Sequence, residues 1–238
     1  MTSLRGKTYW LVGASAGIGA ELARELDRRG VNLVLSARTK RGLAEVAATL
    51  IRPARLVTLD VSDAEAVKRE SALLKDIDGV IYMAGDYTPM SVQNWDTTRA
   101  RQISAVNYTG ALNVLGEVAP GFLNRNHGHI VVIGSLAGLT GLPGAVSYGA
   151  STAALMHLAK NLREDMKGTE VRVQRINPGF VDTRLTRKND FRMPFIMTPE
   201  RAATKITAHM ESARFSASFP KLFAWYFKLK AISEIIRS

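Results

Sequence analysis

Cysteine is absent from this sequence and histidine is scarce, and both absences remove classes of functional site. None of the 238 residues is cysteine and only four are histidine. A disulfide scaffold, a cysteine-ligated zinc, an iron–sulfur cluster and a thiol nucleophile are therefore excluded. The histidines lack the spacing of metal ligands, so we predict no metal site. His127 and His129 stand at the start of an apolar run, where we expect both side chains to be solvated.

Long hydrophobic runs are also missing. The longest stretch without a charged residue, 126–159, contains six glycines and Pro143 and so cannot form one lipid-facing helix. The apolar residues near the start break at Gly13 and lead into a charged helix, which argues against a signal peptide. We therefore predict a cytoplasmic protein.

Negative charge is the scarcer sign. Lys and Arg number 32 against 21 Asp and Glu, a formal net charge of +11. Such a surface attracts phosphates, nucleic acid or anionic lipid, although it is equally consistent with a basic solvated surface that has no specific partner. The basic residues are scattered and do not alternate with aromatic residues, so we predict no nucleic-acid partner.

Short apolar runs alternate with longer helical segments. The runs lack the period of two that marks half-exposed strands, which is typical of strands buried on both faces of a parallel sheet. We predict strands at 8–12, 31–36, 55–59, 79–83, 129–134 and 171–176, and helices at 18–29, 40–51, 63–75, 96–125 (with a break) and 148–167. Repeated β-α-β units predict an α/β fold, a doubly wound parallel sheet (Rossmann-type), in a single domain over residues 1–220.

Two finer details follow from the same pattern. Ser62 with Glu65 three residues later predicts a capping box at the third helix. After Pro178 the alternation is lost, so there we expect a loop, a helix at 199–211 and a tail.

A glycine-rich turn joins the first strand to the first helix. Glycine allows a tight turn and lets the backbone approach a pyrophosphate, while the helix N-terminus offers free N–H groups to the anion. The alternative is a turn that only packs the helix on the strand. We predict that the turn binds a dinucleotide through Gly13, Ser15, Ala16, Gly17, Ile18 and Gly19.

The end of the second strand indicates which dinucleotide. An NAD site has a carboxylate there for the ribose hydroxyls, but residues 35–41 contain no acid. Ser36 and Arg38, with Lys40 or Arg41 as further candidates, are instead suited to a 2′-phosphate, because guanidinium pairs with phosphate in a bidentate fork. The alternative is a solvated basic loop. We therefore predict NADP(H) as the cofactor. Asp60, after the third strand, is suited to hydrogen-bond an adenine amino group or simply to begin a helix.

These pieces together resemble the short-chain dehydrogenase/reductase family over residues 6–220. The most specific part is the stretch 134–155, GSLAGLTGLPGAVSYGASTAAL. The other matching pieces are the GxxxGxG turn, Asp60-Val61, Ala84-Gly85, Asn107, Ser135, Tyr148, Pro178-Gly179 and Thr183.

The resemblance implies a role for each matched residue. Tyr148 would be the general acid/base and Ser135 would hold the substrate oxygen. Asn107 would support the proton path. Pro178, Gly179 and Thr183 would line the nicotinamide, and Val61, Ala84 and Gly85 would contact the cofactor. The implied reaction is hydride transfer between NADP(H) and a carbonyl or alcohol substrate, in a homodimer or homotetramer.

One residue departs from the family's YxxxK pattern. Thr152 stands four residues after Tyr148, where the family has lysine. Residues i and i+4 share a helix face, so that lysine would set a cation beside the phenol and lower its pKa. Thr152 supplies a hydroxyl without charge. Val12 replaces a usual Thr, and Tyr82-Met83 replaces a usual Asn-Asn.

Three interpretations are open at this point. The protein is a working reductase, a cofactor-binding sensor or scaffold that has lost catalysis, or a variant whose motif lysine was replaced to trap a complex. A neutral phenol is the form that reduction needs, so the loss of charge affects reduction less than oxidation.

Two apolar segments bear on substrate and partners. The expected lid, 183–198, mixes basic and bulky apolar residues and indicates an apolar carbonyl substrate, although simple packing explains it equally well. The tail, 221–238, combines aromatic and aliphatic residues with four basic residues and one acid. It is suited to lie on an anionic membrane surface, to dock on a second subunit or to fold over the substrate site.

Overall fold

Seven parallel strands form the centre of the molecule. The computed structural model describes residues 3–237, without the side chains of Lys228 and residues 232–237. The strand order in space is β3-β2-β1-β4-β5-β6-β7. The strands are β1 (Thr8–Val12), β2 (Asn32–Ala37), β3 (Arg55–Thr58), β4 (Gly79–Tyr82), β5 (Gly128–Ile133), β6 (Val171–Pro178) and β7 (Ser216–Phe219).

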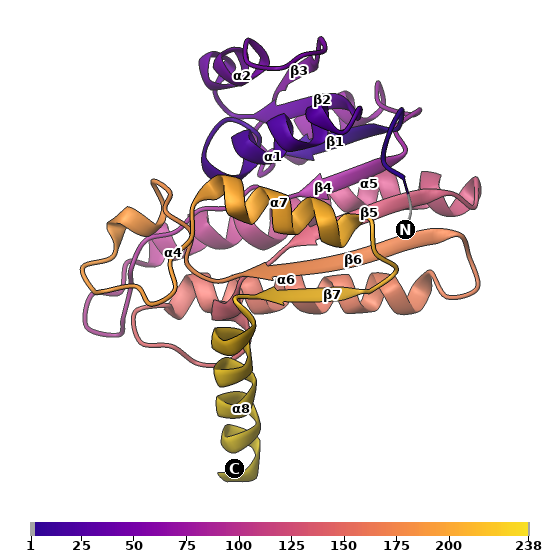
Figure 1. Ribbon diagram of the computed structural model, residues 1–238. Helices are drawn as coiled ribbons and strands as arrows, with labels where there is room; N and C mark the ends of the chain where they lie inside the picture. The colour runs from indigo at the N-terminus through magenta and orange to yellow at the C-terminus, as the bar shows by residue number, and fades with distance from the viewer. Residues whose placement is uncertain (1–2, 238) are drawn as a thin grey trace.

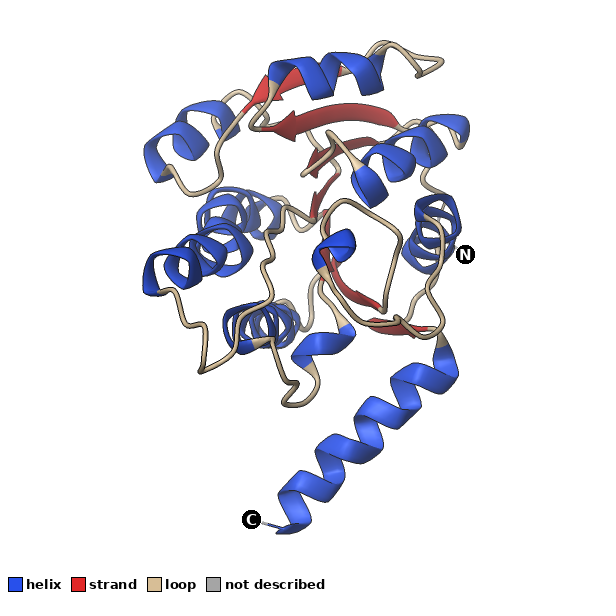
Figure 2. Ribbon diagram, turned by 90° about the vertical axis from the view of Figure 1, so that its left-hand side faces the viewer, coloured by secondary structure: helices blue, strands red, loops and turns tan. Residues whose placement is uncertain are grey.

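Helices cover both faces of this sheet (Figures 1 and 2). The α-helices are α1 (Gly17–Arg28), α2 (Lys40–Ala47), α3 (Ala64–Ser71), α4 (Thr97–Ser104), α5 (Gly110–Asn124), α6 (Val146–Asp165), α7 (Pro199–Met210) and α8 (Lys221–Arg237). A π-helical turn, η1 (Ala105–Thr109), joins α4 to α5, and two 3₁₀ turns are η2 (Leu136–Gly138) and η3 (Thr186–Lys188). The predicted doubly wound parallel sheet is confirmed.

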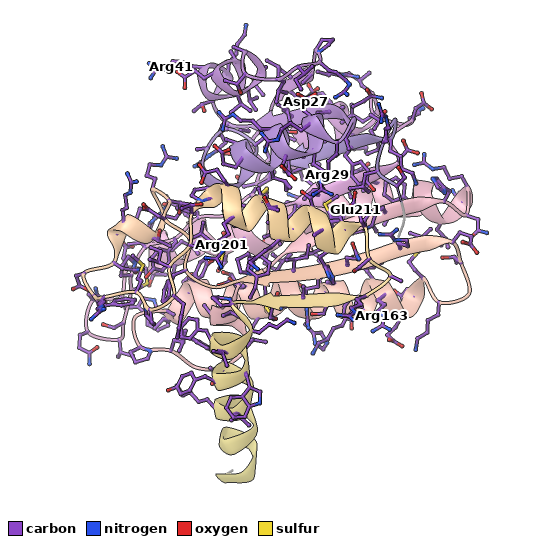
Figure 3. All side chains as sticks on the ribbon, in the orientation of Figure 1. Asp27, Arg29, Arg41, Arg163, Arg201 and Glu211 are labelled. Carbon is purple, nitrogen blue, oxygen red and sulfur yellow. The ribbon has the colours of Figure 1, made fainter. Side chains whose placement is uncertain are left out.

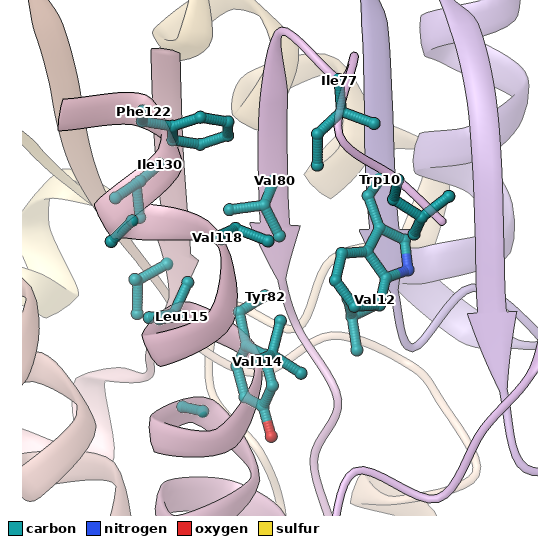
Figure 4. Packing of buried hydrophobic residues seen from close by; sticks show 14 of the residues in the cluster. Trp10, Val12, Ile77, Val80, Tyr82, Val114, Leu115, Val118, Phe122 and Ile130 are labelled. Carbon is teal, nitrogen blue, oxygen red and sulfur yellow. The ribbon is translucent and has the colours of Figure 1, made fainter. Parts of the chain in front are cut away.

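Alternating side chains of each strand feed two separate cores. In β1, Trp10 and Val12 pack with α3, α5 and α6, whereas Tyr9 and Leu11 pack with α1, α2 and α7. Figure 4 shows Trp10 and Val12 near Val80 and Tyr82 of β4, on one side of the sheet. Both faces of β1 are buried, which explains why its sequence shows no alternation of polar and apolar residues.

An ion pair also connects α1 and α7, which cover the same face of the sheet. Arg29, just after α1, forms an ion pair with Glu211, just after α7, at 2.6 Å (Figure 3). Because α7 follows the expected lid in sequence, this contact anchors the end of the helix that the lid leads into.

Three details of the predicted fold are wrong. β7 was not expected, because its sequence, SASF, is short, half polar and lies at the edge of the sheet. The N-cap of α3 is Asp63, whose carboxylate accepts from the Ala66 N–H, while the Ser62 hydroxyl bonds to Asp60. His129 is buried rather than solvated, because its ring is enclosed between Tyr9 of β1 and Gln174 of β6, to which its two nitrogens are hydrogen-bonded.

α8 extends away from the body of the molecule in both ribbon views (Figures 1 and 2). Part of the predicted tail lies outside the described residues: Ser238, and the side chains of Lys228 and residues 232–237. Within residues 3–237, none of the helices combines the length and apolar character that crossing a bilayer requires.

Candidate active site

A cleft of about 300 Å³ opens at the carboxyl ends of the strands. β1 pairs with β2 on one side and β4 on the other, and in such sheets ligands bind where the strand order reverses. Every predicted site residue lines this one cleft: Gly13, Ser15, Ala16, Gly17, Ile18, Gly19, Ser36, Arg38, Asp60, Val61, Ala84, Gly85, Asn107, Ser135, Tyr148, Thr152, Pro178, Gly179 and Thr183.

The glycine turn has no room for side chains at two of its positions. Gly13 has φ +98°, and a Cβ built there would lie 2.7 Å from the backbone nitrogen of Ala84. A Cβ on Gly19 would lie 2.1 Å from the Gly13 carbonyl oxygen. The turn therefore lets α1 pack directly against the end of β1 and leaves its backbone bare toward the cleft.

The N-terminus of α1 is free to receive an anion. Its N-cap is Ala16, which provides no side-chain hydrogen bond, and its first turn contains no acidic residue. The N–H groups of a first turn have no partner within the helix and carry partial positive charge. This bare, glycine-lined turn fits a dinucleotide pyrophosphate, since nothing in the first turn competes with a phosphate.

Basic and acidic groups meet at the next two strand ends. Arg38, after β2, is exposed at the cleft, while Ser36 is buried and its hydroxyl accepts from the Trp10 indole. Burial alone would raise the pKa of Asp60, but hydrogen bonds from Ser62 and the charge of Arg38 outweigh it, so the pKa lies below its usual value. Asp60 is therefore an anionic acceptor beside a cation, at the end of the cleft where an adenosine would lie.

Tyr148 and Thr152 lie one turn apart on α6, facing Ser135 after β5. Burial raises the pKa of the Tyr148 phenol, and hydrogen bonding with Ser135 and Thr152 offsets only part of that rise. Among the described residues, no cation contributes to this shift. The phenol is therefore protonated at neutral pH, as expected when no charge stands at position 152.

Ser135 is fixed at the start of η2. Its hydroxyl accepts from the Ala137 N–H at 3.2 Å, which caps the 3₁₀ turn and holds the side chain in the cleft. The hydroxyl hydrogen is left to donate, either to the phenol or to another oxygen in the cleft.

Asn107 is held by its whole amide group. Its Oδ1 accepts from the Asp86 N–H at 2.7 Å, and its Nδ2 donates to the Asp86 carbonyl at 3.0 Å and to the Ser151 hydroxyl at 3.1 Å. It lies in η1, and single π-turns inside helices are frequent at functional sites. The break expected in the 96–125 helix is this turn.

Sequence reasoning missed the residues that support Asn107. Asp86 is buried and pairs with Arg99 of α4 at 2.6 Å; burial would raise its pKa, but Arg99 keeps it below the usual value. The usable signal was position, because Asp86 directly follows Ala84-Gly85 at a strand end. Ser151 was visible only as the neighbour of Thr152.

Tyr87 connects Tyr148 to the expected lid. Its ring meets that of Tyr148 edge-on, with centroids 4.9 Å apart, and its hydroxyl donates to Asn189 Oδ1 at 2.6 Å. Lys188 donates to the Tyr87 carbonyl at 2.5 Å. Through these contacts with Tyr87, the segment 183–198 lies next to the end of the cleft that contains Tyr148.

Apolar side chains of the lid and of α8 form one cluster beside Gly179. The ring of Phe180 lies 5.9 Å from Phe191 and 5.7 Å from Phe223, and Phe195 lies 5.8 Å from Phe223. Leu136, next to Ser135, packs on α8. Within the described part of the chain, no group of three His, Asp or Glu side chains is placed to hold a metal ion.

Comparison with known proteins gives consistent relatives. The family model described as short chain dehydrogenase matches residues 7–193. An uncharacterized oxidoreductase of Myxococcus xanthus is 35% identical over 230 residues, covering 92% of this chain and 90% of that protein. The NADP-dependent 3-hydroxy acid dehydrogenase of Escherichia coli K12 is 33% identical, covering 72% of this chain and 71% of the relative.

Solved structures agree. A short chain dehydrogenase from Burkholderia cenocepacia in complex with NADP has a TM-score of 0.85 at 25% identity, covering 98% of this chain and 96% of that one. A short-chain dehydrogenase from Sphingobium yanoikuyae in complex with NADPH has a TM-score of 0.86 at 24% identity, covering 97% and 95%; at that identity the likeness concerns the fold.

Proposed function

Because the chain belongs to the short-chain dehydrogenase/reductase family, we propose that it transfers a hydride between NADP(H) and an apolar carbonyl or alcohol substrate. One observation carries the proposal. A single cleft joins the bare N-terminus of α1 and Arg38 at one end to Ser135 and Tyr148 at the other. Anion recognition and a proton donor are thus separated along one groove, as an extended dinucleotide and a small reacting group require.

The cofactor end favours the phosphorylated dinucleotide. Arg38 is exposed at the cleft, where its guanidinium can pair with a 2′-phosphate, and the end of β2 carries no carboxylate to bind free ribose hydroxyls. Relatives whose names specify NADP, and a solved neighbour in complex with NADP, are consistent with this choice.

The catalytic end supplies a positioned proton. When bound, the cofactor provides or accepts the hydride. In reduction, the Tyr148 phenol gives its proton to the carbonyl oxygen as the carbon gains the hydride, and the Ser135 hydroxyl donates a hydrogen bond to that oxygen. Since burial keeps the phenol protonated, Tyr148 at neutral pH is in the form that gives up a proton in reduction.

An aromatic cluster next to the cleft supports an apolar substrate. The cluster of Phe180, Phe191, Phe195 and Phe223 lies next to Gly179, which lines the cleft. Polar and apolar residues both line the cleft, so apolar walls can bind a substrate while the Ser135 and Tyr148 hydroxyls orient it. We propose that residues 1–220 act as the catalytic domain of a homodimer or homotetramer.

Turnover on a panel of carbonyl compounds with NADPH tests the function. Tyr148→Phe should lower the reduction rate by about 100-fold or more, because a positioned general acid contributes about 10²–10⁴. The matched control is Tyr226→Phe, which removes the same hydroxyl from an exposed residue of α8. Equal loss in both variants, or none in Tyr148→Phe, would exclude Tyr148 as the acid.

The same experiment separates enzyme from sensor. Tight NADPH binding with no turnover on any carbonyl compound would support the interpretation that Thr152 has cost the protein its chemistry. Turnover that Tyr148→Phe abolishes, with NADPH binding retained, supports the reductase.

A further inference from the structure

α8 presents two different apolar faces, and only one of them is covered. Ala224 and Phe227 are buried, and with Phe223 they pack against Leu136, Leu139 and Leu142 of the loop that follows Ser135. The remainder of the helix extends away from the body, as the two ribbon views show (Figures 1 and 2). The inner face therefore fixes the helix to the protein, and none of the described side chains covers the outer face.

Four large side chains make up this outer face. Leu222, Trp225, Tyr226 and Leu229 are 75%, 63%, 59% and 43% exposed. Their spacing, i, i+3, i+4 and i+7, places them in one stripe along the helix. Isolated exposed apolar residues are ordinary, but a contiguous stripe containing a tryptophan and a tyrosine marks a surface that is covered in use.

Lysines border the stripe on both sides. At about 100° of rotation per residue, the stripe spans about 100° from Trp225 to Tyr226, with Lys221 about 40° beyond one edge and Lys230 about 40° beyond the other. Lys230 donates to the Gly141 carbonyl at 2.7 Å, which keeps its charge at that margin. Between positions 221 and 231 the sequence has no acid, and the whole chain carries +11.

We propose that the outer face of α8 docks on an anionic lipid surface. An apolar stripe with aromatic residues, flanked by lysines, is the pattern of helices that lie in the plane of a membrane interface. Lipid phosphates would place negative charge opposite this lysine-bordered face. The proposal does not depend on the enzymatic activity.

A second copy of the chain fits this face less well. Pairing two such stripes would bring the lysine margins of both copies together, and no described side chain of α8 offers an acid to offset them. The four side chains of the outer face are also far fewer than the roughly 20–30 residues that each partner contributes to a standard protein–protein interface.

Tryptophan fluorescence tests the docking with minimal change to the protein. Trp10 is buried, whereas Trp95 and Trp225 are exposed. Phosphatidylcholine vesicles containing phosphatidylglycerol should shift the emission to shorter wavelength as Trp225 enters lipid. The shift should persist in Trp95→Phe and disappear in Trp225→Phe. A shift that survives Trp225→Phe overturns the proposal.

Co-sedimentation with the same vesicles tests the stripe and the charge. Leu222→Ser/Trp225→Ser should bind about tenfold more weakly or worse, because interfacial binding scales with buried apolar area. The matched control is Ile51→Ser/Leu73→Ser, which removes two side chains of like exposure, 75% and 62%, from elsewhere. Lys221→Gln should lose about fivefold, the value of one charge near an anionic surface, and only when phosphatidylglycerol is present.

Three results would contradict the proposal. Binding that is equal on vesicles with and without phosphatidylglycerol removes the charge argument. Equal losses in the stripe variant and its control remove the stripe. A halved particle mass in light scattering of Leu222→Ser/Trp225→Ser would show that the stripe is a subunit interface.

Discussion

Thr152 is the residue that decides how far the site can work in both directions. It lies one turn after Tyr148, buried, and interacts with the phenol without supplying charge. We predict that Thr152→Lys lowers the pKa of Tyr148 by about 1–3 units, since a nearby opposite charge favours the phenolate. Oxidation needs the phenolate and rises with pH through that pKa, so its pH–rate profile should move to lower pH.

Reduction provides the internal comparison for this variant. It needs the neutral phenol, so its rate near pH 7 should change little. Thr152→Met is the control for side-chain size without charge. An equal gain in oxidation from the methionine variant would show that volume, not charge, limits the reaction.

Arg38 tests the choice of dinucleotide. A hydrogen bond to a charged group is worth about 1.5–3 kcal/mol, so Arg38→Gln should weaken NADPH binding by roughly 10- to 100-fold and leave NADH binding nearly unchanged. Isothermal titration measures both. Arg41→Gln is the control, because Arg41 is exposed, pairs with Glu45 at 3.0 Å and does not line the cleft. Equal loss in both variants would indicate a general effect of surface charge.

At the scale of single residues, the sequence predicts the residues of the site better than it predicts the side chains that hold them in place. Positions such as Ser135 and Tyr148 follow from the resemblance of residues 134–155 to the short-chain dehydrogenase/reductase family. The support of Asn107 does not, because Asp86 reaches its partner Arg99 through the path of the loop between β4 and α4. Ion pairs of that kind depend on where a loop places a side chain, which no local pattern encodes.

Elements were predictable where burial dictates sequence. β1 matches its predicted range because both of its faces are buried and nearly every residue is apolar. β7 is not predicted from the sequence, because an edge strand of four residues has one neighbouring strand and few buried side chains. The sequence predicts a break in the 96–125 helix but not that the break is the π-turn η1, since a π-turn adds a residue without changing the composition.

His129 couples three strands and gives the fold a pH dependence. Its Nδ1 lies 2.7 Å from the Tyr9 hydroxyl and its Nε2 lies 2.9 Å from Gln174 Oε1, so β1, β5 and β6 are joined through one buried ring. Burial, with a contribution from Arg172, lowers the pKa of His129 from 6.5 to about 3. The folded state therefore holds the ring neutral.

The consequence for stability has a definite sign. Between about pH 6 and pH 4 the unfolded chain binds a proton at this histidine and the folded chain does not. The free energy of unfolding should therefore fall on acidification, by about 1.4 kcal/mol per pH unit. Urea titrations across this range measure the slope.

His129→Gln isolates the contribution. Glutamine keeps a hydrogen-bonding group but does not titrate, and His209, whose pKa burial also lowers, is present in both proteins. The variant should be less stable at pH 7 yet show a flatter dependence on pH. An unchanged slope would assign the pH dependence to other groups.

On the scale of the whole molecule, the cleft is assembled by the sheet rather than by any one segment. Its walls come from the segments that follow β1 to β6, brought together because parallel strands all end at one edge. This explains why the sequence predicts the lining residues although they are far apart along the chain. It also means that a ligand bound there touches most of the fold and should stabilise it as a unit.

Thermal unfolding turns that statement into a prediction. A ligand at 100 times its Kd adds about 2.7 kcal/mol to the folded state. For a chain of this size each kcal/mol raises Tm by about 2–4 °C, so NADPH should raise Tm by roughly 5–10 °C. NADH at the same concentration should give a clearly smaller shift, because it lacks the phosphate that Arg38 is placed to bind. Equal shifts would mean that the cleft does not distinguish the two, and no shift from either would remove the cofactor from the cleft altogether.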